Sequence, residues 1–211
     1  MGMKCIKVLF VVMAVLGLTT SLIAAEIHDC AARGDMTAVK SIVERDPMQV
    51  HAVDGKCMTP VDLAISNGQM TIVQYLIGKG ASVQQRGVEC EPPLLIAVKK
   101  GYTPIVELLL SRNASVNIKD VNGNSPLHYA SKEGNMELVK LLVSKGADVN
   151  CCNTKGQSPL FVSAKLGDKK LVKYFLKKGA KSDMADESGR YPVDYAAENG
   201  FENIVKMLKK S

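Results

Sequence analysis

The chain has 211 residues, with 27 lysines and arginines against 21 aspartates and glutamates, which gives a formal net charge of +6. This charge is modest: it favours solubility and does not point to a defined class of partner. The sequence has no tryptophan and 4 phenylalanines, a composition that argues against a thick globular core and fits thin layers of paired helices. By length alone the chain could form one or two globular domains.

Residues 1–25 have the pattern of a secretory signal peptide. Lys4 and Lys7 precede an uncharged apolar run, and the segment closes on the small residues Ala24 and Ala25. A basic start, an apolar middle and a small-residue end are the three regions of such a peptide. We therefore expect export, to the periplasm or as a secreted protein, with cleavage after Ala25 or after Ala24.

An uncleaved membrane anchor is the alternative interpretation of this segment. The stretch from Val8 to Ala25 carries no charge, and its length is close to the ~20 apolar residues that span a bilayer. The polar side chains of Thr19, Thr20 and Ser21 weaken this alternative. Export of a cleaved protein remains the main expectation.

From residue 26 onward, the same residue types recur every 33 positions. The most regular segment begins with Ser125-Pro126-Leu127-His128-Tyr129-Ala130. Two columns define the period: prolines at Pro60, Pro93, Pro126, Pro159 and Pro192, and glycines at Gly68, Gly101, Gly134, Gly167 and Gly200. A fixed period of this length indicates a stacked array of repeats.

The segment that begins at Ser125 resembles the Thr-Pro-Leu-His-x-Ala signature of the ankyrin-repeat family, with Ser in place of Thr. The resemblance covers about residues 26–211. It implies an all-α repeat solenoid, an ankyrin-repeat stack of helix-turn-helix units joined by β-hairpin-like loops. Within this single elongated domain we expect an N-terminal cap at 26–53, repeats at 54–86, 87–119, 120–152 and 153–185, and a C-terminal cap at 186–211.

Local rules predict where the helices of each repeat begin and end. Hydroxyls at Thr59, Ser125 and Ser158 can cap a helix, and the proline that follows suits the first helical position. The glycine column should end this first helix. The second helix should bury four apolar columns, as at Leu138, Val139, Leu141 and Leu142, and should end at Gly80, Asn113, Gly146 and Gly179.

Two repeats depart from this pattern. In the first, one residue is inserted and Pro47 should stop the second helix, because proline has no amide hydrogen. In the third, Pro92 replaces the capping hydroxyl and Cys90 replaces a glycine. The hairpin around Glu89 to Pro93 is therefore uncertain from the sequence.

The histidines and cysteines suggest structural roles. The resemblance implies that His128 bonds backbone between repeats, and its sequence neighbours supply no base or nucleophile. Five cysteines follow the leader, an odd number that cannot pair completely. Cys57 and Cys90 hold equivalent positions in adjacent repeats, and a helix-layer separation of ~8–10 Å exceeds the ~4.4–6.8 Å that a disulfide spans. We therefore expect reduced, structurally dispensable thiols, with no metal site and no cofactor.

The resemblance implies a non-enzymatic scaffold that binds another protein, does not bind nucleic acid and is a monomer. The family binds partners on a concave surface made of hairpin tips and first helices. At the tips this surface comprises Lys56, Met58, Glu89, Glu91, Asn122, Asn124, Lys155, Gln157 and Arg190. The first helices add Lys99, Lys100, Lys132, Glu133, Lys165 and Leu166. The charges run from acidic near Glu91 to basic toward Arg190, which suggests a partner of opposite polarity along its length.

Two other classes of function compete with this interpretation. The basic second helix within Asp168–Lys178 could contact an anionic membrane or another polyanion, although its apolar residues fall in columns expected to be buried. A thiol redox protein would need a cysteine of low pKa beside a base. The identity of a protein partner does not follow from the sequence.

Overall fold

The computed structural model describes residues 26–84 and 90–210, and every regular element within these ranges is a helix. The predicted signal peptide and Glu89 lie outside the described residues. The helices form two compact units, of which the first ends at Ser82 and the second begins at Val83. An all-helical repeat stack was the expected architecture, and it is the one observed.

The first unit holds the first two repeats. Residues 26–33 are helical and are followed by α2 (Met36–Arg45), the 3-10 helix η1 (Pro47–His51), α3 (Pro60–Ser66) and α4 (Met70–Gly78). Helix α2 packs on η1 and α4, and α3 packs on α4 and η1. Helix α2 ends just before Pro47, as predicted, and the Asp46 carboxylate accepts the Met48 N–H at 3.1 Å to start η1.

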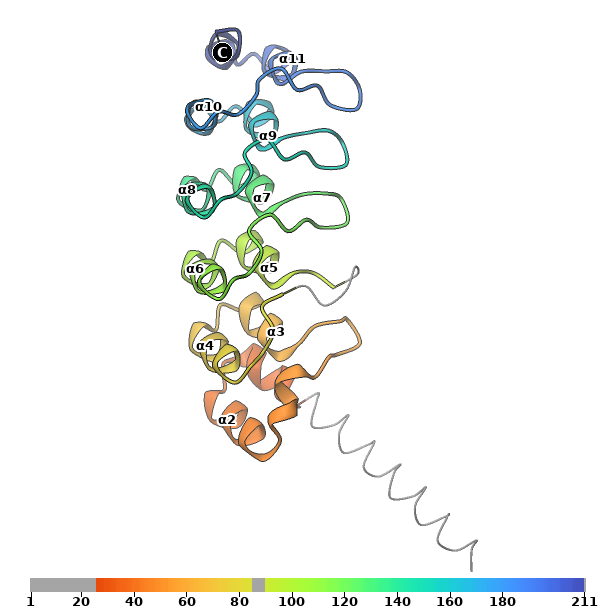
Figure 1. Cartoon of the computed structure of the whole chain (residues 1–211), viewed down its shortest axis with the longest axis vertical. Coiled ribbons are helices and arrows are strands. Elements are labelled where there is room, and N and C mark those ends of the chain that lie inside the picture. The colour runs from red at the N-terminus through yellow and green to blue at the C-terminus, as the bar shows by residue number, and fades with distance from the viewer. Residues whose placement is uncertain (1–25, 85–89, 211) are drawn as a thin grey trace, which may run out of the picture. The chain divides into compact units, whose positions relative to one another are not determined.

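The second unit holds the remaining repeats as helix pairs. They are α5 (Pro93–Lys99) with α6 (Thr103–Ser111), α7 (Pro126–Lys132) with α8 (Met136–Ser144), α9 (Pro159–Leu166) with α10 (Lys169–Lys177), and α11 (Pro192–Glu198) with α12 (Glu202–Leu208). Figure 1 shows α5, α7, α9 and α11 stacked in one column and α6, α8 and α10 in a second. The loops that precede α7, α9 and α11 project from the first column, away from the second.

The first helices begin at the residues that the sequence indicates. Asp62 Oδ2 accepts the Thr59 N–H at 2.8 Å, and Ser158 Oγ accepts the Phe161 N–H at 3.2 Å. In the third repeat Pro92 precedes α5, and no side chain caps that helix. The predicted hydroxyl cap is confirmed at Ser158, and the predicted missing cap is confirmed before α5. At Thr59 the bond runs from the residue's own N–H to the Asp62 carboxylate instead.

The helices also end as expected. The glycines of the column have positive φ values between 64° and 73° at Gly68, Gly101, Gly134 and Gly200, and 79° at Gly167. Asn113 takes the same left-handed conformation at φ 63°. At Gly167 a Cβ atom would lie 2.6 Å from Phe201 Cζ, so this position excludes a side chain for steric as well as backbone reasons.

One predicted core column is only partly buried. Leu138, Val139 and Leu142 are buried, but Leu141 is half-buried, and so is Tyr174 at the equivalent place in α10. The prediction that all four columns are buried is wrong for this one. Its side chains lie at the border of the apolar stripe, where a long side chain leaves part of its surface in water.

The expectation that all five thiols are reduced is wrong. Cys57 and Cys90 are disulfide-bonded, whereas Cys30, Cys151 and Cys152 have free thiols. The sequence argument used the separation of packed helices, but both bonded cysteines lie in loops outside the helices. Cys57 also has a positive φ of 64°, a backbone conformation that the helix-layer estimate does not represent.

The stacked pairs predict unequal costs for two leucine truncations. Leu142 in α8 is 0% exposed within the stack, whereas Leu208 in α12, the last described helix, is 5% exposed. Leu142→Ala should lower the free energy of unfolding by about 2–5 kcal/mol, and Leu208→Ala by clearly less, because neighbouring repeats enclose only the first site. Urea denaturation of both variants measures this. Equal losses would contradict nearest-neighbour stacking.

Candidate functional site

The second unit contains a concavity of about 580 Å³ on the loop side of the fourth and fifth repeats. Four segments build it: the loop before α7, helix α7, the loop before α9, and helix α9. We call it the central concavity and define it by its lining residues, which are Asn122, Asn124, His128, Tyr129, Lys132, Asn153, Thr154, Lys155, Gln157, Val162, Lys165 and Leu166.

Each loop is held by the first residue of its tip. Asp120 Oδ1 accepts the N–H groups of Asn122 at 3.0 Å and of Asn124 at 2.8 Å. Asn153 Oδ1 makes the same two bonds, both at 3.0 Å, in the next loop. Such bonds replace the pairing that a regular strand would provide. The tip side chains that follow are therefore presented from fixed backbones.

Adjacent loops are also bonded to each other through the main chain. The Thr154 N–H donates to the Asn122 carbonyl at 2.9 Å, and the Glu187 N–H donates to the Lys155 carbonyl at 3.0 Å. The loops approach so closely that a Cβ atom on Gly123 would lie 2.8 Å from the Thr154 nitrogen. Side chains add to these bonds, because Asn153 Nδ2 donates to Asn124 Oδ1 and the Thr154 hydroxyl donates to the Asn122 carbonyl, both at 2.9 Å. Backbone and side-chain hydrogen bonds together set the spacing of the tips.

Tyrosines hold equivalent positions in two first helices of the second unit, Tyr129 in α7 and Tyr195 in α11, and we call this position the tyrosine column. The Tyr129 hydroxyl donates to Asp120 Oδ2 at 2.5 Å, and Lys99 Nζ lies 4.4 Å from the Tyr129 ring centroid. Two repeats further on, the Tyr195 hydroxyl donates to Asp186 Oδ2 at 2.9 Å. Lys165 Nζ lies 4.9 Å from the centre of the Tyr195 ring. Each ring is thus bonded at its hydroxyl and covered by a lysine of the preceding repeat.

The fifth repeat interrupts this column. Val162 stands where the neighbouring repeats have tyrosine, and Asn153 stands where they have the aspartate that accepts the hydroxyl. Lys132, the equivalent of Lys99 and Lys165, therefore has no ring beneath it. The central concavity is located where this ring is missing, since Val162, Lys132 and Lys165 all line it.

Some cationic side chains around the concavity form ion pairs within the chain, and others do not. Lys99 forms an ion pair with Glu91, and Arg190 forms one with Glu198 while its guanidinium lies 3.9 Å from the Tyr195 ring centroid. These two cations are compensated within the chain. No ion pair joins Lys132, Lys155 or Lys165 to another described residue, and the described residues that line the concavity include no carboxylate.

Two aspartates that flank the concavity, Asp120 and Asp186, accept hydrogen bonds from their own repeats. Although burial raises the pKa of Asp120, hydrogen bonds from the Tyr129 hydroxyl and from two backbone N–H groups outweigh burial, and the pKa lies below its ordinary value. The Ser188 hydroxyl, together with the Arg190 N–H and the Tyr195 hydroxyl, holds the pKa of Asp186 well below the ordinary range. Both groups stay ionised near neutral pH as loop ligands.

The structure places the predicted binding residues in three situations. Seven line the central concavity: Asn122, Asn124, Lys132, Lys155, Gln157, Lys165 and Leu166. Five more belong to the second unit but lie outside the lining. Glu91 and Lys99 pair with each other, Arg190 pairs with Glu198, and Lys100 and Glu133 are exposed at the ends of α5 and α7. Lys56 and Met58 belong to the first unit, where the Met58 carbonyl lies 2.9 Å from His28 Nε2.

Sequence reasoning did not include five of the lining residues: His128, Tyr129, Asn153, Thr154 and Val162. A signal for the tyrosine position was present, because Tyr129 and Tyr195 are 66 residues apart in equivalent columns and Val162 lies midway. The absence of one ring in this column is what separates the concavity from an ordinary groove.

His128 has the expected backbone role, and a thiol from a distant part of the sequence lies near it. Its Nδ1 accepts the Ser125 N–H at 3.1 Å, so Nε2 carries the proton and donates to the Gln157 carbonyl at 2.8 Å. Cys151 Sγ lies 3.3 Å from Ser125 Oγ and 3.9 Å from His128 Nδ1. This neighbour belongs to the following loop and is not visible from the sequence around His128.

The cysteine and the histidine do not form an activated pair. Burial lowers the pKa of His128, and burial raises the pKa of the Cys151 thiol. An activated nucleophile requires the opposite, a thiolate beside a protonated imidazole. Both ring nitrogens of His128 are already hydrogen-bonded. The thiol redox alternative therefore gains no support at this position.

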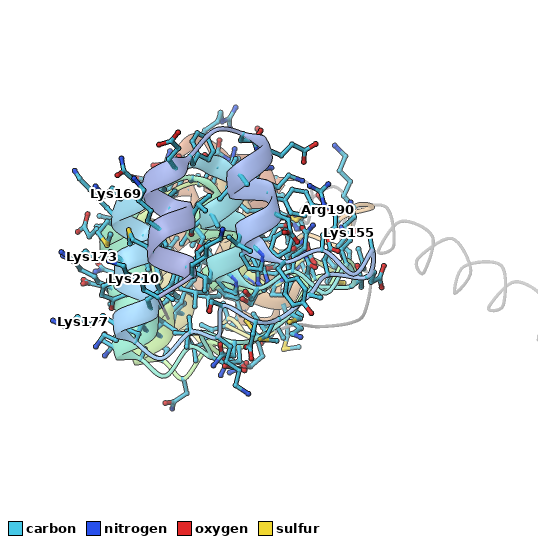
Figure 2. The ribbon with its side chains drawn as sticks, turned by 90° about the horizontal axis from the view of Figure 1, so that it is seen from above. Lys155, Lys169, Lys173, Lys177, Arg190 and Lys210 are labelled. Carbon is cyan, nitrogen blue, oxygen red and sulfur yellow. The ribbon has the colours of Figure 1, made fainter. Side chains whose placement is uncertain are left out.

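The lysine-rich second helix lies on another face of the unit. Lys169, Lys173 and Lys177 are exposed on α10. In the view of Figure 2, they and Lys210 lie on one side, and Lys155 and Arg190 lie on the opposite side. The apolar residues Leu171, Val172 and Phe175 of α10 are buried in the stack. The helix consequently presents charge to solvent without a broad apolar face.

Searches for other kinds of site gave two negative findings for residues 26–84 and 90–210. None of their helices has the length and apolar character needed to cross a membrane. They also contain no group of three or more histidine, cysteine, aspartate or glutamate side chains arranged to hold a metal ion.

Comparison with protein families gives one match. The model described as ankyrin repeats (3 copies) matches residues 27–120, 84–153 and 127–211. These ranges together span every predicted repeat and both caps. A search of curated proteins found no match.

Burial of neutral His128 predicts a pH-dependent contribution to stability. The pKa of His128 is lowered from 6.5 in the folded chain, so the unfolded chain binds more protons as the pH falls through this value, and stability is lost on acidification. His128→Phe should reduce the loss of unfolding free energy between about pH 7.5 and about pH 5.5. At the higher pH it should cost about 1–3 kcal/mol, because the Gln157 carbonyl loses its donor.

Urea denaturation of both proteins at the two pH values measures these changes. The substitution should be accommodated sterically, because Phe161 occupies the same column and is 0% exposed. His28 and His51 are present in both proteins, so their contributions cancel in the comparison. An unchanged pH dependence in the variant would show that His128 is not the titrating group.

Proposed function

Because the chain belongs to the ankyrin-repeat family, whose repeats generally mediate protein–protein interaction, we propose that this protein is a non-enzymatic scaffold that binds another protein after export. The observation that carries the proposal is the central concavity, a preformed surface whose lysines form no ion pair with another described residue. A partner that contacts several repeats at once would meet tips held at a fixed spacing. Pre-ordered contacts of this kind reduce the entropy cost of binding.

The peripheral membrane alternative has weaker support. Membrane-surface helices combine a basic face with an apolar face that enters the lipid. On α10 the larger apolar side chains Leu171, Val172 and Phe175 are buried against neighbouring helices, which leaves the lysines alone for lipid headgroups. Electrostatic attraction without apolar insertion is screened at physiological salt.

The oxidised cysteines support the export part of the proposal. Disulfides form and persist in oxidising compartments such as the periplasm and the extracellular space, and they are rare in the cytosol. Cys57 and Cys90 are disulfide-bonded, which fits the signal-peptide pattern at the start of the sequence. Two independent features, one compositional and one covalent, thus favour the same compartment.

Protein recovered from the exported fraction should begin at Glu26 or at Ala25 and should have Cys57 and Cys90 oxidised. Intact mass spectrometry gives the N-terminus, and peptide mapping without reductant gives the state of each cysteine. Cys152 serves as the control, because it should react with a thiol reagent before reduction. A product that starts at Met1 in the membrane fraction would favour the anchor. Reduced Cys57 in that material would contradict export to an oxidising compartment.

Site-specific photo-crosslinking in the native compartment tests the binding surface. A photoreactive residue at Leu166, which is 53% exposed and lines the concavity, should give an adduct with a discrete protein. The same residue at exposed Lys173 on α10 is the matched control and should give no protein adduct. Adducts from Lys173 alone, or lipid adducts in place of protein, would overturn the assignment to the loop and first-helix surface.

A further inference from the structure

We propose that the central concavity binds an extended acidic peptide segment in which carboxylates flank one apolar side chain. This inference rests on the proposed protein-binding function and specifies the chemistry of the segment that is recognised. It is argued from the missing ring, the uncompensated lysines and the unused amide groups at this one place in the stack.

The missing ring provides space for an apolar side chain. In the neighbouring repeats, Tyr129 and Tyr195 fill this position and bond an aspartate through the hydroxyl. Val162 leaves the volume of that ring unfilled and is itself only half-buried. Leu166, one of the few exposed large apolar side chains among the described residues, lines the same space. The concavity lies within the ~300–1,000 Å³ range of pockets that enclose a ligand group.

The charged side chains that line this space have one sign. Lys132, Lys155 and Lys165 are exposed and come from α7, the following loop and α9. Glu133 follows Lys132 directly but does not line the concavity. On either side, Lys99 and Arg190 are neutralised by Glu91 and Glu198. The positive potential is therefore concentrated at the concavity, where it would favour carboxylates on a partner.

Polar groups at the rim can bind the backbone of such a segment. The side-chain amides of Asn122 and Gln157 make no hydrogen bond with another described residue, and they lie on consecutive loops that are bonded to each other through Thr154. Amide groups both donate and accept, so they suit an extended peptide, whose N–H and C=O groups are exposed. A protein segment can use the apolar space, the lysines and the amide groups together.

A polyanion such as a nucleic acid or a polyphosphate would use only the lysines. Bidentate phosphate recognition uses arginine, whose planar group binds two oxygens at once, whereas lysine binds phosphate as a point charge. Arg190, the arginine that the described part of the chain places on the neighbouring loop, is engaged by Glu198 and by the Tyr195 ring. An acidic peptide is therefore the occupant that the observations favour, and a polyanion is one outcome of the test.

The test begins with a phage-displayed library of random dodecapeptides panned on the purified protein. Selected peptides should contain acidic residues around a leucine, isoleucine or phenylalanine. Each is then synthesised with a fluorescent label, and its dissociation constant is measured by anisotropy at low and at physiological salt. Affinity should fall as salt rises, because exposed charges are screened.

Two variants separate the contributions. Val162→Tyr, with Asn153 unchanged, places a ring where Tyr129 and Tyr195 lie in the neighbouring repeats without adding a charge, so it should fill the space and weaken binding roughly tenfold or more. Lys132→Gln, Lys155→Gln and Lys165→Gln together should weaken binding to a similar extent, about tenfold, and reduce its salt dependence. The control is Lys169→Gln, Lys173→Gln and Lys177→Gln on α10, which should leave binding unchanged within about twofold.

Three results would overturn the proposal. Selected peptides without acidic residues would contradict the charge argument. Acidic peptides that bind the ring-restored variant normally would contradict the apolar anchor. Equal competition by inorganic polyphosphate, with binding lost only in the concavity lysine variant, would assign a general anion site. In each of these cases a protein adduct at Leu166 would still support the proposed function. The proposed function and this inference can therefore fail separately.

Discussion

Helices of seven to nine residues, such as those of the second unit, cannot persist alone in water. Their apolar sides must be covered by the neighbouring pair, and that requirement determines the rest of the structure. It places the buried residues of α8 and α10 inside the stack and leaves their lysines outside. It also brings the loops of consecutive repeats close enough for main-chain hydrogen bonds. A functional surface in such a chain can use only the side chains that are not buried between stacked repeats.

The tyrosine column shows how stacking and surface chemistry are connected. Where the ring is present, as at Tyr129, its hydroxyl binds the loop aspartate and a lysine from the preceding repeat covers its face. A single ring thus ties together a loop, its own helix and the helix before it. Where Val162 replaces it, the backbone keeps the same loop bonds through Asn153. The site therefore arises from an omitted group in a framework that does not need it.

Most of the fold could be predicted from the sequence because its determinants are local. The capping residue Ser158, the helix-ending Asn113 and the helix-stopping Pro47 act within a few positions of themselves. The features that could not be predicted concern contacts between residues far apart in sequence. Cys151 approaches His128 from the next loop, and Cys57 has a loop conformation that a helix-layer distance could not represent.

The candidate site was predictable to a similar extent and for the same reason. The register identified the tips and first helices, so Lys132, Lys155 and Leu166 could be listed in advance. It could not show that Glu91 and Arg190 are already paired within the chain, since each partner lies 8 residues away and the pairing depends on how the loop folds over its helix. Repeat periodicity gives positions, whereas the local three-dimensional pairing decides which charges remain uncompensated.

The bonds between adjacent loops use main-chain atoms and the side chains of Asn124, Asn153 and Thr154. The side chains of Asn122, Lys155 and Gln157 contribute no hydrogen bond to another described residue. Substitutions at these three positions should therefore be nearly neutral for folding, and selection there would act through recognition alone. Such a chain can change its binding preference by small steps without first acquiring compensating stability, so the tips would be the fastest-diverging part of the repeats while the stack beneath them stays constant.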